Sequence, residues 1–210
     1  LNNYLSCPWK FFYRNLLQLP EEKNKYLIYG SAVHNAVNRY LRAAKVSSPT
    51  VDYLLNAFEQ SLFKESLAGT EYDELLQKGK KSLPGYLKER LVNWPKNIQT
   101  ELFISGINLN DDIKLTGKID LIEDIGKAGQ VIVYDLKTGR IKRRSEIEDY
   151  KRQLLFYKLL LDRYRQGRMK MIKGVVDFIE PDDKGQYHQE IFDMETAEVN
   201  ALEKQIIFIG

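Results

Sequence analysis

The chain has 210 residues, a hydrophobic fraction of 43% and a net charge of +3, which are ordinary values for a globular domain with a buried core. No run approaches 18 apolar residues, which excludes a membrane-spanning helix. The single cysteine, Cys7, excludes an internal disulfide and a multi-cysteine metal site. Because the chain begins at Leu1 and ends on an apolar run, we expect one domain, residues 1–210, excised from a longer protein.

The predicted elements change from helical to strand periodicity at Trp94 and Pro95. Apolar spacing first predicts helices over residues 1–17, 30–44, 51–67 and 71–93. Strands are then predicted over 98–104, 113–123 and 130–137, followed by a helix over 147–164, a strand hairpin over 171–179 and 187–192, and a helix from residue 195. This order predicts an α/β domain with a central mixed sheet flanked by helices and a helical insertion at about 50–96.

The strand over 130–137 carries the most informative pattern. Val131, Val133, Asp135 and Lys137 alternate along it and therefore share one face. The two valines indicate that this face is buried, so the carboxylate and the ammonium at its end need a partner, a metal ion or a wet cleft. An ion pair that closes the end of the strand is the simplest explanation of this segment taken alone.

A second carboxylate, Asp120, lies on the preceding strand. If the two strands pair symmetrically about their loop, Asp120 faces Asp135, and facing side chains have Cβ atoms about 4.5–5.5 Å apart. Two carboxylates at that distance resist joint ionisation, and a divalent cation removes the conflict. The pattern therefore favours a Mg²⁺ or Mn²⁺ site, beside which Lys137 would polarise water or stabilise a phosphoryl group.

Three further side chains are candidates for such a site. His34 lies beside the buried stripe of its helix, which suits either a metal ligand or a buried core histidine. Gln153 and Tyr157 are four residues apart on one helix and share a face, so they are candidates for hydrogen bonds to a phosphate or to the site. The alternative for this pair is the edge of an amphipathic helix.

Basic residues are concentrated just after the acidic strand. Between residues 135 and 152 there are seven Lys or Arg side chains and four Asp or Glu side chains, which accounts for the whole net charge. Such an excess indicates an anionic partner, although a solvated loop before a charged helix is also compatible with it. The residues most suited to phosphate contact are Arg140, Lys142, Arg143 and Arg144.

Five segments together resemble the RecB-type branch of the PD-(D/E)XK nuclease superfamily. They occur in the order and approximate spacing of that family: residues 4–13 (YLSCPWKFFY), 30–34 (GSAVH), 117–120 (GKID), 135–139 (DLKTG) and 153–157 (QLLFY). The resemblance spans nearly the whole chain. It implies a restriction-endonuclease-like core and metal-assisted hydrolysis of DNA by an activated water.

The resemblance also implies roles for individual residues. The Mg²⁺ or Mn²⁺ ligands would be His34, Asp120, Asp135 and the Leu136 carbonyl, with Lys137 as the catalytic lysine. Gln153 and Tyr157 would lie near the DNA, and Glu101 would match an accessory acidic position. Some relatives bind an iron–sulfur cluster with four cysteines, of which Cys7 matches the first, and this chain has no other cysteine. Either it is a member without a cluster or the remaining ligands lie outside this sequence; we expect no cluster, because many relatives have the same cysteine–proline pair without one.

Such modules often form part of DNA repair helicases, so DNA, a helicase domain or subunit and a cytoplasmic location are expected. A catalytically inactive module that binds DNA or braces a helicase is the main alternative, and a nuclease directed at RNA is a weaker one. The sequence does not distinguish exonuclease from endonuclease activity.

Overall fold

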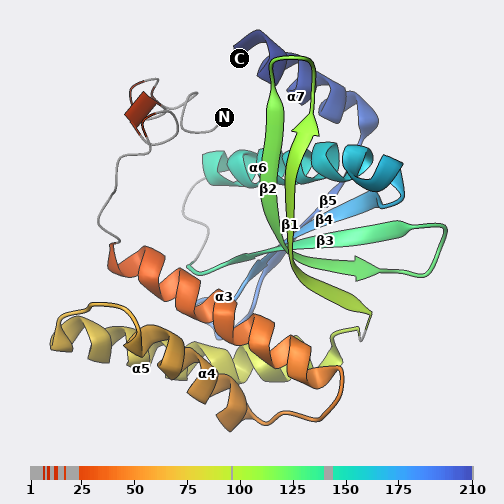
Figure 1. Cartoon of the computed structure of the whole chain (residues 1–210). Coiled ribbons are helices and arrows are strands. Elements are labelled where there is room, and N and C mark those ends of the chain that lie inside the picture. The colour runs from red at the N-terminus through yellow and green to blue at the C-terminus, as the bar shows by residue number, and fades with distance from the viewer. Residues whose placement is uncertain are drawn as a thin grey trace.

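The computed structural model describes residues 7, 9, 12, 13, 17, 24–95, 97–139 and 144–209, with the backbone alone at residues 144 and 145. The lead-in helix predicted over residues 1–17 falls mostly outside these ranges. The remaining predicted helices and strands are all present, with shifted ends (Figure 1).

The first block of the fold is helical. It comprises α3 (Lys25–Ala44), α4 (Val51–Phe63), α5 (Gly69–Glu89) and the short 3-10 helix η2 (Leu91–Asn93). Helix α3 begins five residues earlier than predicted because Asn24 caps it: the Asn24 side chain accepts hydrogen bonds from the backbone N–H groups of Tyr26 and Leu27. The apolar spacing that predicted the helix starts only one turn later.

The second block is a five-stranded sheet whose strands lie in sequence order. The strands are β1 (Ile98–Asn108), β2 (Lys114–Asp124), β3 (Gln130–Lys137), β4 (Lys170–Phe178) and β5 (Gln189–Asp193). All neighbours are antiparallel except β3 and β4, which are parallel and are connected through α6 (Arg144–Arg163) and the 3-10 helix η3 (Tyr164–Gly167). The predicted mixed sheet is confirmed, and α7 (Thr196–Ile209) closes the described part of the chain.

The predicted register of β2 and β3 is also confirmed. The structure pairs Leu121 with Tyr134 and continues to Asp124 with Val131, which is the symmetric hairpin expected from the loop. Extending this register by one position places Asp120 across from Asp135, at the end of the paired segment. The two acidic residues therefore lie where the strands begin to separate.

Strand β1 runs four residues further than predicted. Its pairing with β2 shifts between Ile104 and Ile107, and Gly106 within this bulge has a φ of +69°. Glycine adopts this conformation without strain, so the Ser105–Gly106 pair that suggests the end of a strand is instead absorbed by a β-bulge.

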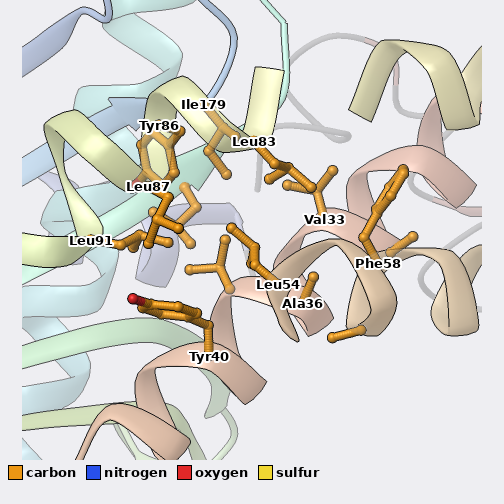
Figure 2. Packing of buried hydrophobic residues seen from close by; sticks show 14 of the residues in the cluster. Val33, Ala36, Tyr40, Leu54, Phe58, Leu83, Tyr86, Leu87, Leu91 and Ile179 are labelled. Carbon is orange, nitrogen blue, oxygen red and sulfur yellow. The ribbon is translucent and has the colours of Figure 1, made fainter. Parts of the chain in front are cut away.

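Two hydrophobic clusters cover the opposite faces of the sheet. One joins α3, α4, α5 and η2 to side chains from the strand ends, including Leu121, Leu136 and Ile179 (Figure 2). The other packs α6 and α7 against the sheet, with Val133 and Leu160 fully buried. Among the residues that the structure describes, no helix is both long and apolar enough to cross a bilayer.

Candidate active site

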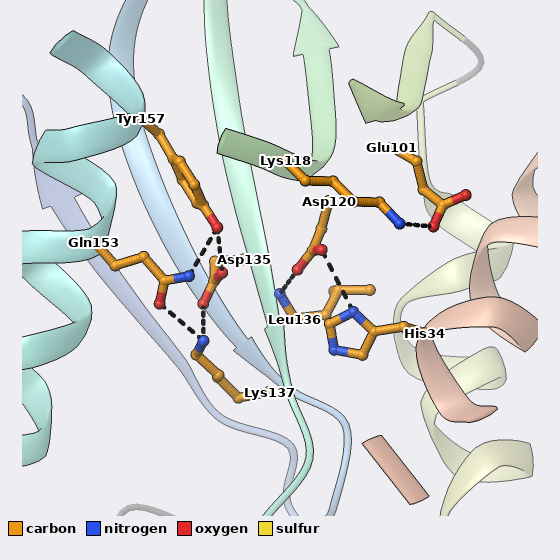
Figure 3. A network of polar contacts seen from close by, with 9 residues as sticks. All are labelled: His34, Glu101, Lys118, Asp120, Asp135, Leu136, Lys137, Gln153 and Tyr157. Atoms are coloured by element: carbon orange, nitrogen blue, oxygen red, sulfur yellow. Dashed lines mark hydrogen bonds and ion pairs between the residues drawn. The ribbon is translucent and has the colours of Figure 1, made fainter. Parts of the chain in front are cut away.

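The acidic end of β3 is held in a network of polar contacts with α6. Asp135 is buried, with 2% of its surface exposed, and its Oδ2 atom lies 2.7 Å from Lys137 Nζ. Lys137 Nζ also donates a hydrogen bond to Gln153 Oε1 at 2.9 Å (Figure 3). The buried charge of Asp135 is thus partly balanced by a lysine that α6 holds in place.

Tyr157 completes this network from the next turn of α6. Its hydroxyl accepts a hydrogen bond from Gln153 Nε2 at 2.7 Å and lies 3.4 Å from Asp135 Oδ1. Both predicted side chains on this face of α6 therefore contact residues at the acidic end of β3.

Asp120 faces α3 rather than α6. Its Oδ2 atom accepts a hydrogen bond from the backbone N–H of Leu136 at 3.1 Å, and its Oδ1 atom lies 3.4 Å from His34 Nδ1. The site thus draws His34 from α3, Asp120 from β2 and Asp135 with Lys137 from β3, which are remote in sequence (Figure 3).

The pKa shifts of these groups reflect burial and mutual charge. Burial raises the pKa of Asp135, and the Asp120 charge raises it further, although Lys137 opposes the change. Burial alone would raise the pKa of Asp120 and lower that of His34. Their mutual hydrogen bond and opposite charges outweigh it, so the pKa of Asp120 is lowered and that of His34 is raised.

These residues suit a divalent cation in their chemistry. The Asp120 carboxylate lies beside the His34 imidazole and the Asp135 carboxylate beside the Lys137 ammonium, and the buried Asp135 Oδ2 has no aligned hydrogen bond although Lys137 lies close to it. Oxygen and imidazole donors of this kind match Mg²⁺ or Mn²⁺. Within the described ranges, however, no three His, Cys, Asp or Glu side chains are already gathered closely enough to hold a metal ion. Binding one ion to His34, Asp120 and Asp135 together would therefore require these side chains to move closer to one another.

Glu101, the predicted accessory acidic residue, forms ion pairs with two cationic side chains. It lies on β1 and accepts hydrogen bonds from Lys118 Nζ at 2.5 Å and from Arg42 Nη2 at 3.3 Å. Sequence reasoning missed both cations. Lys118 precedes Asp120 by two residues on the same strand, and this spacing was the available signal.

Tyr150 is a second residue that sequence reasoning missed. Its ring centroid lies 5.3 Å from Lys137 Nζ. Tyr150, Gln153 and Tyr157 recur at helical spacing on one face of α6, which was the available signal.

Of the predicted phosphate contacts, Arg140, Lys142 and Arg143 lie outside the described residues, and Arg144 is the first residue of α6.

A family model described as the PD-(D/E)XK nuclease superfamily matches residues 1–205. The chain belongs to the PD-(D/E)XK nuclease superfamily. Its sheet and flanking helices have the restriction-endonuclease-like fold of that superfamily. Membership supports nuclease activity on DNA, and nucleases of this superfamily generally use divalent metal ions.

Two solved structures resemble the chain. A crystal structure from Eubacterium rectale, described as a proposed exonuclease, is 12% identical with a TM-score of 0.55, over 97% of this chain and 73% of that one. The crystal structure of SSO0001 is 20% identical with a TM-score of 0.38, over 93% of this chain and 81% of that one. The first likeness concerns the fold alone. No curated protein sequence matches the chain.

Proposed function

We propose that this PD-(D/E)XK protein is a Mg²⁺- or Mn²⁺-dependent deoxyribonuclease. One observation carries the proposal: two acidic residues from neighbouring strands lie at the end of the β2–β3 pair in two adjoining sets of contacts. One set joins Asp120 to a histidine from α3 and to the Leu136 N–H, and the other joins Asp135 to Lys137. Family membership adds the reaction class, which is hydrolysis of a phosphodiester bond.

The metal ligands in this proposal are His34, Asp120, Asp135 and the Leu136 carbonyl. A bound divalent ion supplies Lewis-acid polarisation of a phosphoryl oxygen and lowers the pKa of a bound water. Because Asp120 hydrogen-bonds the Leu136 N–H, the carboxylate and the Leu136 backbone are already held together. Deprotonated Asp120, favoured by its lowered pKa, is the form that binds a cation.

Lys137 is proposed to stabilise the charge that develops on the phosphoryl group. Its ammonium lies between Asp135 Oδ2 and Gln153 Oε1, so two groups fix its direction. Gln153 and Tyr157 act by holding Lys137 and Asp135 in place, since Tyr157 also contacts Asp135 Oδ1. This arrangement preorganises the lysine before the substrate binds.

The experiment is cleavage of linear and circular DNA, single- and double-stranded, with Mg²⁺, Mn²⁺ or EDTA. Asp120→Asn, Asp135→Asn and Lys137→Met should each lower the rate at least about 100-fold. Asp124→Asn is the matched control, because Asp124 is exposed on the same strand as Asp120 and should leave the rate unchanged. Full activity in any one of the three site variants would remove that residue from the mechanism.

Metal binding has a readout that does not depend on cleavage. An ion bound only by the folded protein raises the melting temperature with increasing metal concentration. Mn²⁺ should stabilise the wild type and the Asp124→Asn variant but not Asp120→Asn. Equal stabilisation of all three proteins would place the ion elsewhere.

The RecB-type assignment, a role in DNA repair and a helicase partner belong to the same proposal, supported by the order of the five sequence segments. The basic run after β3 is proposed to contact the DNA backbone. Arg143→Ala combined with Arg144→Ala should weaken DNA binding and reduce its dependence on salt. DNA binding without cleavage under any metal condition would instead favour the catalytically inactive module.

A further inference from the structure

A cavity of about 420 Å³ opens beside the proposed metal site. His34 and Asp120 line it together with the hydroxyl residues Ser31 and Thr138. Among the described residues that line the cavity, Lys118 is the one Lys or Arg. Its side-chain hydrogen bond is with Glu101, and not with Asp135 or Lys137, so the contacts around Asp135 do not explain why a lysine lies here.

We propose that Lys118 binds the substrate phosphate adjacent to the scissile one, and that Glu101 positions Lys118 and is not a metal ligand. The inference rests on the proposed nuclease function and extends it to a second phosphate subsite. Lys118 precedes Asp120 by two residues, which is roughly 7 Å along a strand. A phosphate at Lys118 would therefore lie about one backbone unit away from a scissile phosphate at the proposed metal site that includes Asp120.

The backbone at Glu101 supports a functional reason for this contact. Glu101 has a φ of +55°, which is rare for a residue other than glycine, and the β1–β2 pairs resume on either side of it, at Thr100 and Leu102. Strain of this kind is concentrated at functional sites, where surrounding contacts maintain it. Here the distortion accompanies the contact of the Glu101 carboxylate with Lys118 (Figure 3).

The charges around Glu101 favour an anion over a second cation. Glu101 contacts both Lys118 and Arg42, so these three side chains carry a net charge of +1, and the negative charge of Asp120 lines the same cavity. Arg42 is fixed further by a hydrogen bond from its Nε atom to Thr100 Oγ1 at 2.9 Å. A metal ion at Glu101 would be repelled by both cations, whereas a phosphate would be attracted by them.

The Lys118–Glu101 pair is poorly explained as a stabilising contact. The Lys118 side chain is 53% exposed, and exposed ion pairs contribute little to folding stability because water and salt screen them. The same exposure leaves the Lys118 side chain accessible to a ligand in the cavity. Glu101 thus restricts the lysine to one direction while leaving it accessible.

Variants of Lys118 test the subsite. Lys118→Gln should raise KM about ten-fold with little change in kcat, and should reduce the salt slope of DNA binding by about 0.7–0.9. Lys118→Arg, which keeps the charge, should restore most of the affinity. Lys114→Gln is the matched control, since Lys114 is exposed on the same strand but does not line the cavity.

A modified substrate locates the contact. Oligonucleotides with a single uncharged methylphosphonate on either side of the scissile bond should bind the wild type more weakly at one of these positions. The Lys118→Gln variant should be insensitive to the same replacement. Equal sensitivity of both proteins, or an unchanged KM and salt slope in Lys118→Gln, would overturn the subsite while leaving cleavage, and hence the proposed function, intact.

Glu101→Gln separates the two roles of the carboxylate. As a positioning residue, Glu101 should affect KM and not Mn²⁺ affinity. A loss of Mn²⁺ stabilisation together with a loss of kcat matching Asp120→Asn would show that Glu101 is a metal ligand and refute the positioning role. If the wild type binds DNA without cutting it, the salt slope still tests Lys118; a chain that does not bind DNA refutes both this inference and the proposed function.

Discussion

Replacing Asp177 with asparagine should stabilise the protein at neutral pH and have little effect near pH 4. Asp177 lies on β4 with 0% of its surface exposed, and burial raises its pKa from 3.8 to about 6. Tyr86 on α5 donates a hydrogen bond to Asp177 Oδ2 at 2.8 Å, and Arg90 Nε lies 3.8 Å from Oδ1. These two groups, together with a hydrogen bond from the Gln189 side chain, compensate only part of the loss of hydration.

The magnitude follows from the two pKa values of Asp177. Between about pH 4 and pH 6 the folded state binds more protons than the unfolded state at this group, so stability decreases as the pH rises through that window. A difference of about two pH units corresponds to about 3 kcal/mol at pH 7 and above. Asparagine keeps an oxygen for the Tyr86 hydroxyl and has no charge to bury, so Asp177→Asn should recover up to this amount.

The assay is thermal or urea unfolding of wild type and Asp177→Asn from pH 4 to pH 8. At pH 7 the variant should melt about 6–12 °C higher, and the difference should shrink toward zero at pH 4. Asp182→Asn is a control of opposite sign, because hydrogen bonds from the Gln186 N–H and from His188 lower the pKa of Asp182 to about 2. Its native stabilisation is present above pH 4 and is lost as the pH falls toward 2, so the variant should be the less stable protein at pH 7.

The result that refutes the argument is an Asp177→Asn variant that is no more stable than the wild type at pH 7. A stabilisation that does not change with pH would also refute it, since the effect would then come from packing and not from charge.

Two further predictions concern the core and the lysine of the site. A Cβ atom at Gly79 would lie 2.2 Å from the buried ring of Phe58, so Gly79→Ala should lower the free energy of unfolding by about 1–3 kcal/mol. Gly69→Ala, where a Cβ meets open space, should change it by less than about 1 kcal/mol, and equal melting temperatures for the two would contradict the packing. Tyr150→Leu should lower kcat about three- to ten-fold by removing the ring near Lys137, while Tyr150→Phe retains it; equal rates for Leu and Phe would exclude the ring as a positioning group.

Much of the fold could be predicted because its signals are local. The alternation of Val131, Val133 and Asp135 predicts one buried face of a strand, and the short loop after Asp124 fixes the register of the hairpin. The ends of helices and strands were less predictable where a capping residue or a β-bulge extends the element beyond its apolar pattern. Asn24 caps α3 ahead of its apolar stripe, and the bulge at Gly106 lets β1 continue past a turn-like pair.

By itself, the sequence determined the order of helices and strands, the mixed sheet and the register of the β2–β3 hairpin, because strand periodicity and hairpin symmetry act over a few residues. Only the tertiary structure decided which distant groups meet: Gln153 with Lys137, and Glu101 with Arg42. These contacts depend on how α6 and α3 pack on the sheet. Sequence periodicity shows which residues share a face of one helix or strand, but it does not show which residues of two separate elements come into contact.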